Sequence, residues 1–249
     1  MVDDAEESAS TDGAPEELRG RLALALDVDD LVAAERLARD LSPWFGVAKV
    51  GLELYSAAGP DAVTAMVRLG YDVFCDLKLH DIPTTVQRTA RVIGALGARY
   101  LTLHAVGGAP MLRAGVEGLA EGAAGAALST PMALGVTVLT SEPEASHRAL
   151  ATRVAAAMAG GCGGLVCASP DLHEVRQLAP RMVLVVPGIR PAGTVANDQA
   201  RVGTPADAFA AGADILVIGR AVTASPDPRA AAERLVAGLR QPAAAVPPI

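Results

Sequence analysis

Short runs of apolar residues recur along the chain, and each run ends in polar residues or glycine. These runs predict eight strands, at residues 22–27, 47–51, 71–78, 100–105, 132–138, 164–169, 182–188 and 215–220. Apolar runs of this length, bounded by turn-forming residues, are typical of strands that are buried on both faces.

Segments rich in Ala, Leu and Arg separate the runs, and most carry apolar residues at helical spacing. They predict helices at residues 29–41, 60–69, 85–96, 109–122, 144–159, 171–178, 205–211 and 228–239. Strands that alternate with helices pair in parallel, because a parallel crossover needs an intervening element. Eight such units predict the α/β class and a single-domain (β/α)8 TIM barrel.

An open, doubly wound sheet is the alternative architecture. Its nucleotide-binding form carries Gly-x-Gly-x-x-Gly in the first strand-to-helix turn, where the glycines let a pyrophosphate approach the backbone. The corresponding turn here, residues 26–30, reads Leu-Asp-Val-Asp-Asp and lacks these glycines. We therefore rank the closed barrel first.

The two ends of the chain differ in composition from the 222 residues between them. Residues 1–18 combine acidic and small residues with few large apolar ones, which predicts a disordered acidic leader. Residues 241–249 are rich in Pro and Ala and predict a frayed tail. The barrel domain is accordingly predicted at residues 19–240.

The charge of the chain changes how its partners are predicted. The net charge is −7, but seven acidic residues precede the first basic residue, Arg19. The remaining acids equal the 21 Lys and Arg in number, so the sequence predicts no basic surface for nucleic acid. No apolar run reaches the roughly 18 residues of a membrane span, and the N-terminal stretch lacks the apolar core of a secretory signal. We predict a cytoplasmic protein with no membrane partner.

Charged residues follow three successive predicted strands. Asp27, Lys49, Asp76 and Lys78 alternate in sign, and the carboxyl ends of barrel strands meet at one mouth. Asp76 and Lys78 are two residues apart on one strand, so both side chains point to the same face. Burying such charges is costly unless they pair or meet a ligand. We therefore predict a catalytic site in which a charged lysine donates a proton. The alternative is a set of structural salt bridges at the rim.

A second group of residues suits a phosphate. The loops after strands seven and eight of this fold often bind phosphate through backbone N–H groups, and here they contain Gly188 with Arg190 and Gly219 with Arg220. The long polar segment from 190 to 204 resembles a lid, on which Gln199 could close over the phosphate. The alternative is that the glycines only end the strands and the arginines are solvated.

Other reactive side chains carry no predicted role. His80 and His104 lie near the mouth, and each could equally be satisfied by the backbone or a neighbouring acid. The cysteines are odd in number and form no Cys-x-x-Cys pair, so we predict neither disulfides nor a zinc site, and we interpret them as core residues.

One stretch resembles a known family. Residues 76–85, Asp-Leu-Lys-Leu-His-Asp-Ile-Pro-Thr-Thr, closely resemble the signature of the orotidine 5'-phosphate decarboxylases in their bacterial branch. The resemblance extends over residues 21–239. Its other motifs are Leu-Ala-Leu-Asp at 24–27, Lys-Val-Gly at 49–51, Val-Thr-Val-Leu-Thr-Ser at 136–141, Pro-Gly-Ile-Arg-Pro at 187–191, Asp-Gln at 198–199 and Val-Ile-Gly-Arg at 217–220.

The resemblance implies a homodimeric barrel that decarboxylates orotidine 5'-monophosphate to UMP, in pyrimidine biosynthesis, without a metal or organic cofactor. It implies that Lys78 protonates C6 while Asp76 lies beside the departing carboxylate. Lys49 and Asp27 would bind ribose hydroxyls and complete the charge network.

The same resemblance assigns the remaining site residues. Asp81 and Thr85 would reach into the partner subunit's site, and Ile82 between them joins the substrate-binding set. Thr140, or Ser141 beside it, would contact the pyrimidine. The phosphate would be held by Arg190, Gln199, Gly219 and Arg220.

Two rival functions stay open at this point. The 3-keto-gulonate 6-phosphate decarboxylases and hexulose-phosphate synthases share the Asp-x-Lys-x-x-Asp core but use magnesium held by acids. Here Lys49 stands where a metal site would want an acid, although Glu53 follows closely. The other rival is a non-catalytic nucleotide-binding barrel, which would have no need to bury two lysines against two acids.

Overall fold

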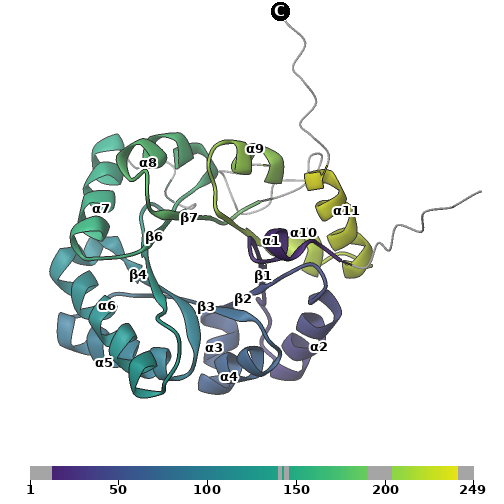
Figure 1. Ribbon diagram of the computed structural model, residues 1–249, viewed down its shortest axis with the longest axis horizontal. Coiled ribbons are helices and arrows are strands. Elements are labelled where there is room, and N and C mark those ends of the chain that lie inside the picture. Colours follow the sequence, from purple (N-terminus) through teal and green to yellow (C-terminus); the bar gives the residue numbers. More distant parts are fainter. Residues whose placement is uncertain (1–12, 140–141, 143–145, 190–203, 241–249) are drawn as a thin grey trace, which may run out of the picture.

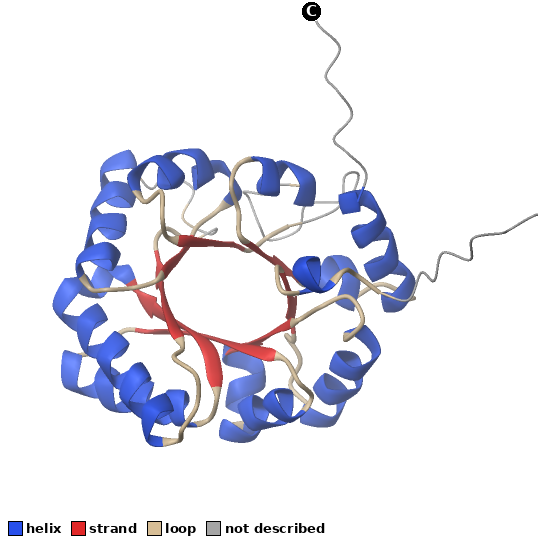
Figure 2. Cartoon of the chain, in the orientation of Figure 1, coloured by secondary structure: helices blue, strands red, loops and turns tan. Residues whose placement is uncertain are grey.

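A computed structural model shows the chain as a closed barrel of eight parallel strands surrounded by helices (Figure 1). The structure describes residues 13–139, 142, 146–189 and 204–240. Each strand pairs with the next in sequence, and β8 pairs with β1 to close the ring. Figure 2 shows the strands as the inner ring and the helices outside it. The predicted TIM barrel is confirmed.

All eight predicted strands are present, and most end earlier than predicted. They are β1 Leu22–Ala25, β2 Val47–Gly51, β3 Asp72–Leu79, β4 Ala98–His104, β5 Met132–Val136, β6 Gly164–Val166, β7 Val183–Val186 and β8 Ile215–Ile218. The predicted runs included the polar residues that follow each strand. Those residues leave the hydrogen-bonded ladder and form the mouth of the barrel.

The eight predicted helices are also present, with ends shifted by a few residues. They are α2 Leu31–Leu41, α4 Pro60–Arg68, α5 Pro83–Ala95, α6 Gly108–Gly125, α7 His147–Ala159, α8 Leu172–Leu178, α9 Pro205–Ala210 and α11 Pro228–Arg240. The short 3-10 helices η1 Ala105–Gly107 and η2 Ser169–Asp171 precede α6 and α8.

Three short helices were not predicted. These are α1 Glu16–Arg19, α3 Leu52–Ala58 and α10 Arg220–Thr223. Helix α3 follows β2 without a loop, so the sequence offers no turn signal between them, and Gly59 then bends the chain into α4 with a φ of 58°. Helix α1 begins within the predicted leader and ends at Arg19, the first residue of the predicted barrel domain. Residues 1–12 and 241–249 lie outside the described residues, so the disordered leader and tail stay predictions.

Two hydrophobic cores follow from the alternation of side chains along the strands. Alternate strand residues such as Ala23, Phe74 and Val185 point inward and pack inside the barrel. Their neighbours, such as Leu24 and Cys75, point outward and pack beneath the helices. Only 3% of the residues are aromatic, so both cores consist mainly of Ala, Val, Leu and Ile.

The strand β3 departs from regular pairing at its carboxyl end. Cys75 pairs with Leu101 of β4 and Leu79 pairs with Leu103, so three residues of β3 oppose one residue of β4. This is a β-bulge, a feature that re-aims side chains at barrel rims. Lys78 lies inside it with a φ of 49°, in the left-handed region that a residue with a side chain rarely adopts.

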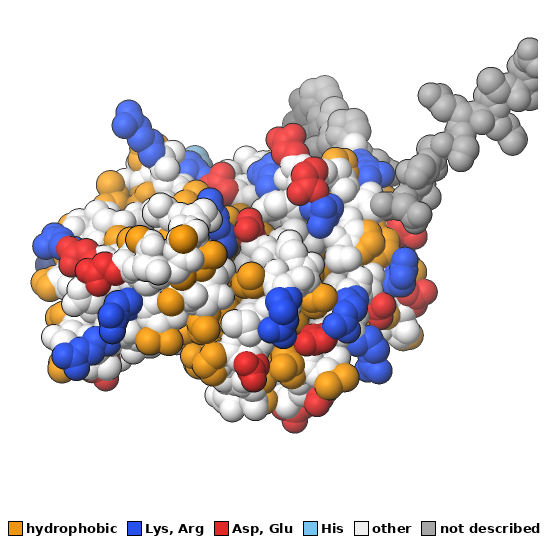
Figure 3. Space-filling view, turned by 60° about the horizontal axis from the view of Figure 1, so that its bottom comes forward, with side chains coloured by type: hydrophobic (Ala, Val, Ile, Leu, Met, Phe, Trp, Pro, Cys, Tyr) orange, Lys and Arg blue, Asp and Glu red, His pale blue; other side chains and the backbone are white. Residues whose placement is uncertain are grey.

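The molecular surface carries charges of both signs. Figure 3 shows acidic and basic side chains interspersed over one face, with hydrophobic side chains between them. Within the described ranges, no helix has the length and apolarity needed to cross a bilayer. The cytoplasmic location and the absence of a nucleic-acid partner stay predictions.

Candidate active site

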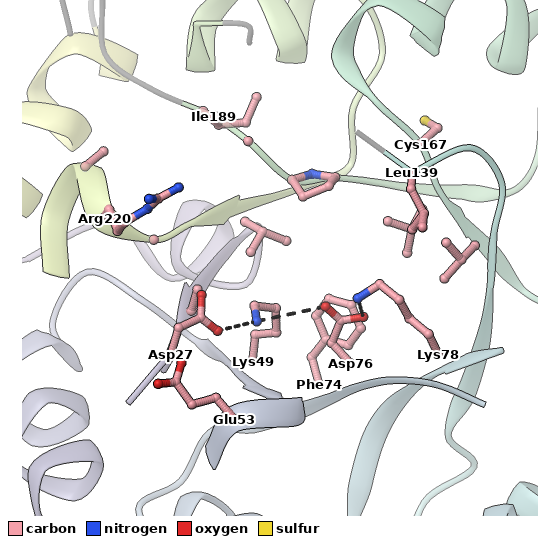
Figure 4. A pocket seen from close by; sticks show the side chains of 18 of the residues that line it. Asp27, Lys49, Glu53, Phe74, Asp76, Lys78, Leu139, Cys167, Ile189 and Arg220 are labelled. Carbon is pink, nitrogen blue, oxygen red and sulfur yellow. Dashed lines mark hydrogen bonds and ion pairs between the residues drawn. The ribbon is translucent and has the colours of Figure 1, made fainter. Parts of the chain in front are cut away.

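A cavity of about 530 Å³ opens at the carboxyl ends of the strands. This volume lies within the range of small-ligand sites. Figure 4 shows the side chains that point into it. The lining residues are Ala25, Asp27, Lys49, Glu53, Phe74, Asp76, Lys78, Val136, Val138, Leu139, Val166, Cys167, Pro187, Gly188, Ile189, Val217, Gly219, Arg220, Ala221 and Thr223.

The four charged residues predicted at the mouth form one chain of ion pairs along a wall of the cavity (Figure 4). Lys49 Nζ lies 2.8 Å from Asp27 Oδ1 and 3.9 Å from Asp76 Oδ2. Lys78 Nζ lies 2.8 Å from Asp76 Oδ1. The predicted convergence of these residues is therefore confirmed as geometry, and Asp76 bridges the two lysines.

Burial strengthens the inner part of this array. The side chains of Lys49 and Asp76 are 9% and 15% exposed, whereas that of Asp27 is 53% exposed. Opposite charges about 4 Å apart attract by about 4 kcal/mol at an effective dielectric of about 20, so the Lys49–Asp76 attraction is stronger than that of a solvated pair and offsets part of the cost of burying both charges. The array fixes the positions of its charges before any ligand enters.

Gly51 makes room for the buried end of the array. A Cβ atom at this position would lie 3.0 Å from Lys49 Nζ and 3.2 Å from Asp27 Oδ1, closer than ordinary contacts. Gly51 also pairs with Asp76 across β2 and β3. The glycine in the Lys49-Val50-Gly51 motif therefore leaves space for the ion pair between Lys49 and Asp27, which a side chain at this position would crowd.

Another part of the cavity lining, the phosphate wall, contains the predicted phosphate residues that the structure describes, namely Gly188, Gly219 and Arg220. Gly219 is the N-cap of α10, and Arg220 is the first residue of that helix. Figure 4 shows Arg220 and Ile189 across the cavity from Asp76. Backbone N–H groups at a helix start and a guanidinium group both suit phosphate oxygens. Gly188 lines the same wall.

The predicted residues that follow β3 do not line this chain's own cavity, and Thr85, predicted on the loop, lies in the first turn of α5. Asp81, Ile82 and Thr85 are exposed, and none of these three described residues lines the cavity. The Asp81 carboxylate accepts a hydrogen bond from the backbone N–H of Ile82 at 2.6 Å. Three further predicted residues, Thr140, Arg190 and Gln199, lie outside the described residues, as does Ser141.

Several lining residues were not predicted from the sequence. Phe74, Ile189 and Val217 supply apolar walls, and Glu53 of α3 lies beside Asp27 and Lys49 (Figure 4). Apolar residues at strand ends look the same in a sequence whether they face the core or a cavity. Position along the strand, two residues before Asp76, is the signal that could have identified Phe74.

The histidines and cysteines stay outside the charged array. The rings of His80 and His104 lie 5.8 Å apart, and neither lines the cavity. All three cysteines are described, buried and without a disulfide, as predicted. Burial raises the pKa of the Cys167 thiol to about 12, so this lining residue is protonated at neutral pH.

The described residues contain no group of three or more His, Cys, Asp and Glu side chains placed to hold a metal ion. Within the array, the acids that a divalent ion would need are paired with lysines: Asp27 with Lys49, and Asp76 with both Lys49 and Lys78. The donor set of these residues therefore does not fit a metal centre. The prediction that no cofactor takes part is not tested by this geometry.

Two proteins of similar sequence carry the same name. A chain from Anaeromyxobacter sp. (strain K) named orotidine 5'-phosphate decarboxylase is 48% identical over 225 residues, covering 88% of this chain and 98% of that protein. A protein of the same name from Thermobifida fusca is 46% identical over 233 residues, covering 88% of this chain and 96% of that one.

A solved structure and a family model are also similar to this chain. The crystal structure of orotidine 5'-phosphate decarboxylase from Lactobacillus acidophilus matches with a TM-score of 0.74 and 30% identity, covering 88% of this chain and 99% of that one. The family model of the orotidine 5'-phosphate decarboxylase / HUMPS family matches residues 20–235, a range that includes the charged array and the phosphate wall. The chain belongs to the orotidine 5'-phosphate decarboxylase / HUMPS family.

Proposed function

We propose that this protein decarboxylates orotidine 5'-monophosphate to UMP, the reaction for which its relatives are named. One observation carries the proposal: the Asp27–Lys49–Asp76–Lys78 array lines one cavity together with Gly219 and Arg220. Gly219 borders the Asp27 end of the array, since a Cβ there would lie 4.0 Å from Asp27 Oδ2. The array supplies charges for the reaction, and Gly219 and Arg220 supply phosphate-binding groups.

Lys78 is the proposed proton donor. Its ammonium group is held by Asp76 at 2.8 Å, and its side chain is 32% exposed towards the cavity. When the bond between C6 and the carboxylate breaks, the electron pair stays on C6 and carbon dioxide leaves. A proton from Lys78 Nζ then forms the new C6–H bond, and the neutral amine regains a proton from water.

Asp76 is proposed to favour the reaction by its charge. A substrate carboxylate placed near Asp76 is repelled in the ground state, and the repulsion disappears as neutral carbon dioxide forms. Lys49 and Asp27 would bind the ribose hydroxyls between this point and the phosphate. Phosphate binding, with Arg190 and Gln199 as further candidates, would offset the cost of holding the carboxylate there.

We further propose a homodimer with shared active sites. Asp81, Ile82 and Thr85 are exposed in this chain, at the same end of the barrel as the cavity. Ile82 is 66% exposed, and two more large apolar side chains after neighbouring strands, Leu52 and Val106, are 58% and 52% exposed. An apolar rim of this kind suits a partner surface. The partner's copy of the loop after β3 and of the first turn of α5 would bring Asp81 and Thr85 to the cavity.

The function is tested by following the loss of orotidylate absorbance with purified protein. We expect turnover by the wild type and a loss of at least about 1,000-fold in kcat for Lys78→Ala, because the proton donor is removed. Equal rates for wild type and variant would remove Lys78 from the mechanism. Activity that disappears with EDTA and returns with magnesium would instead favour the magnesium-dependent alternative.

A further inference from the structure

We propose that Thr102 of β4 is a positioning residue for the reaction, because its hydroxyl group joins the carboxylate of Asp76 to the backbone of Lys78. This inference rests on the proposed function of those two residues. Thr102 does not line the cavity, so its effect would be exerted through its two partners.

The hydroxyl group lies at the centre of three short contacts. Thr102 is completely buried. Its Oγ1 accepts a hydrogen bond from the backbone N–H of Lys78 at 2.8 Å. The hydroxyl hydrogen has two acceptors within reach, Asp76 Oδ1 at 3.1 Å and the Cys75 carbonyl at 3.4 Å. The charged and nearer carboxylate is the stronger acceptor.

The β-bulge in β3 explains why a side chain is needed at this point. Asp76, Leu77 and Lys78 oppose only Thr102, so the regular ladder cannot supply a backbone partner for the Lys78 N–H. A buried donor without a partner would cost about 1–3 kcal/mol. Lys78 also holds a left-handed backbone conformation, which persists only where its surroundings enforce it. The Thr102 hydroxyl provides the missing partner.

The same hydroxyl fixes the orientation of the Asp76 carboxylate. Asp76 Oδ1 accepts hydrogen bonds from Lys78 Nζ at 2.8 Å and from Thr102 Oγ1 at 3.1 Å. Asp76 Oδ2 forms the ion pair with Lys49 Nζ at 3.9 Å. During turnover the Lys78 ammonium must leave Oδ1 to reach the substrate carbon. Thr102 stays bonded to Oδ1 at that moment, so the carboxylate keeps its orientation while its partner moves.

Kinetics of substitutions at Thr102 test this role. Thr102→Val keeps the shape and removes the hydroxyl, and a misplaced reacting group can cost up to about 100-fold in rate. We expect kcat to fall by about 10- to 100-fold with KM changed by less than about threefold, because the ribose and phosphate contacts are kept. Thr102→Ser keeps the hydroxyl and should retain kcat within about threefold of the wild type.

A second buried threonine provides a matched control. Thr137 is also completely buried, and its hydroxyl donates to the Val166 carbonyl at 2.9 Å, with no charged partner. Thr137→Val should lower the melting temperature about as much as Thr102→Val while lowering kcat less. Equal kcat losses in the two variants would show a general packing effect and overturn the inference.

Two further outcomes would overturn the positioning role of Thr102, and a third would reject the proposed function. Wild-type kcat in folded Thr102→Val overturns the positioning role. If that variant does not fold, Thr102→Ala and Thr102→Ser are compared, because both lack the methyl group and differ only in the hydroxyl; equal kcat values overturn the inference. A wild-type protein without activity on orotidine 5'-monophosphate would instead reject the proposed function.

Discussion

Lys49 shows how single residues shape this site. Its ammonium group is nearly buried, yet it contacts two carboxylates, Asp27 and Asp76, so the cost of burying the charge is offset by two opposite charges. The space for this arrangement depends on the missing side chain of Gly51. A charged array of this density tolerates little extra volume.

Gly51→Ala is expected to lower kcat/KM by at least about tenfold, because the new methyl group displaces Lys49 Nζ from its partners and a misplaced group is costly in rate. Steady-state kinetics measure this effect. Gly238→Ala is the matched control, since a Cβ at this exposed helical position meets nothing within 4 Å. Its kinetics should equal those of the wild type. Unchanged kcat/KM in Gly51→Ala would mean that Lys49 can shift without consequence.

His104 gives the folded state a dependence on pH. Its Nδ1 is buried and has no hydrogen-bond partner in the described part of the chain. Burial is the main cause that lowers the pKa of His104 below 6.5, and the positive charge of Arg153 adds to it. The unfolded chain keeps the ordinary pKa of 6.5, so below that pH the unfolded state binds the proton more readily.

The free energy of unfolding should therefore fall as the pH drops below about 6.5, and His104→Asn should show a smaller loss between about pH 7 and pH 5. Urea denaturation at a series of pH values measures this. His147 provides a contrast, because its hydrogen bond to Glu174 raises its pKa. His147→Gln should make the acid loss steeper. An unaltered pH profile in His104→Asn would exclude His104 as the cause.

At the scale of elements, helices α5 and α6 are packed unusually closely through glycines. A Cβ at Gly118 would lie 2.1 Å from the Gln87 carbonyl oxygen, and one at Gly122 would lie 1.9 Å from that of Arg91. Backbone atoms cannot yield as the end of a flexible side chain can. This contact sets the position of α5, whose start follows the loop that carries Asp81.

Gly122→Ala is expected to reduce the free energy of unfolding by about 1–3 kcal/mol, the usual cost of overpacking. Gly125→Ala, three residues later in the same helix, is the control, because a Cβ there meets nothing within 4 Å. Thermal or urea denaturation of both variants measures the difference. Equal stability of the two variants would show that α5 and α6 can separate at no cost.

At the scale of the whole molecule, the proposed homodimer would complete the site. One chain brings together the array and the phosphate wall but leaves Asp81 and Thr85 outside its cavity. A two-fold symmetric dimer would place the same loop of each subunit at the other's site. The proposal of shared sites can be tested without a structure of the dimer.

Lys78→Ala and Asp81→Ala subunits, each inactive alone, should regain about a quarter of the wild-type activity when refolded together in equal amounts. Half of the dimers would then be mixed, and each mixed dimer would have one intact site. The control mixes Lys78→Ala with Asp76→Ala, which act within one subunit and should restore nothing. Absence of recovery in the first mixture would place Asp81 in its own subunit's site.

The sequence by itself determined the fold class and the inner array. Eight apolar runs alternating with helical segments specify parallel pairing, and the closed ring then brings Asp27, Lys49, Asp76 and Lys78 to one mouth, whatever the details of the loops. Alternation along β3 also predicted that Asp76 and Lys78 share a face, and both side chains line the cavity, although a bulge interrupts the regular pairing there. These are regular, local properties, which a linear pattern records.

Only the tertiary structure decided the features that depend on contacts between strands. The sequence contains no sign of the β-bulge, since three residues of β3 face one residue of β4 only when the two strands are paired. The left-handed backbone of Lys78 and the Thr102 hydroxyl between Lys78 and Asp76 belong to that pairing. The steric reason for Gly51 depends on the positions of Lys49 and Asp27 after folding. Residues far apart in sequence come into contact only when the chain has folded. A pattern along the chain could therefore identify the charged residues, but not the residues that hold them in position.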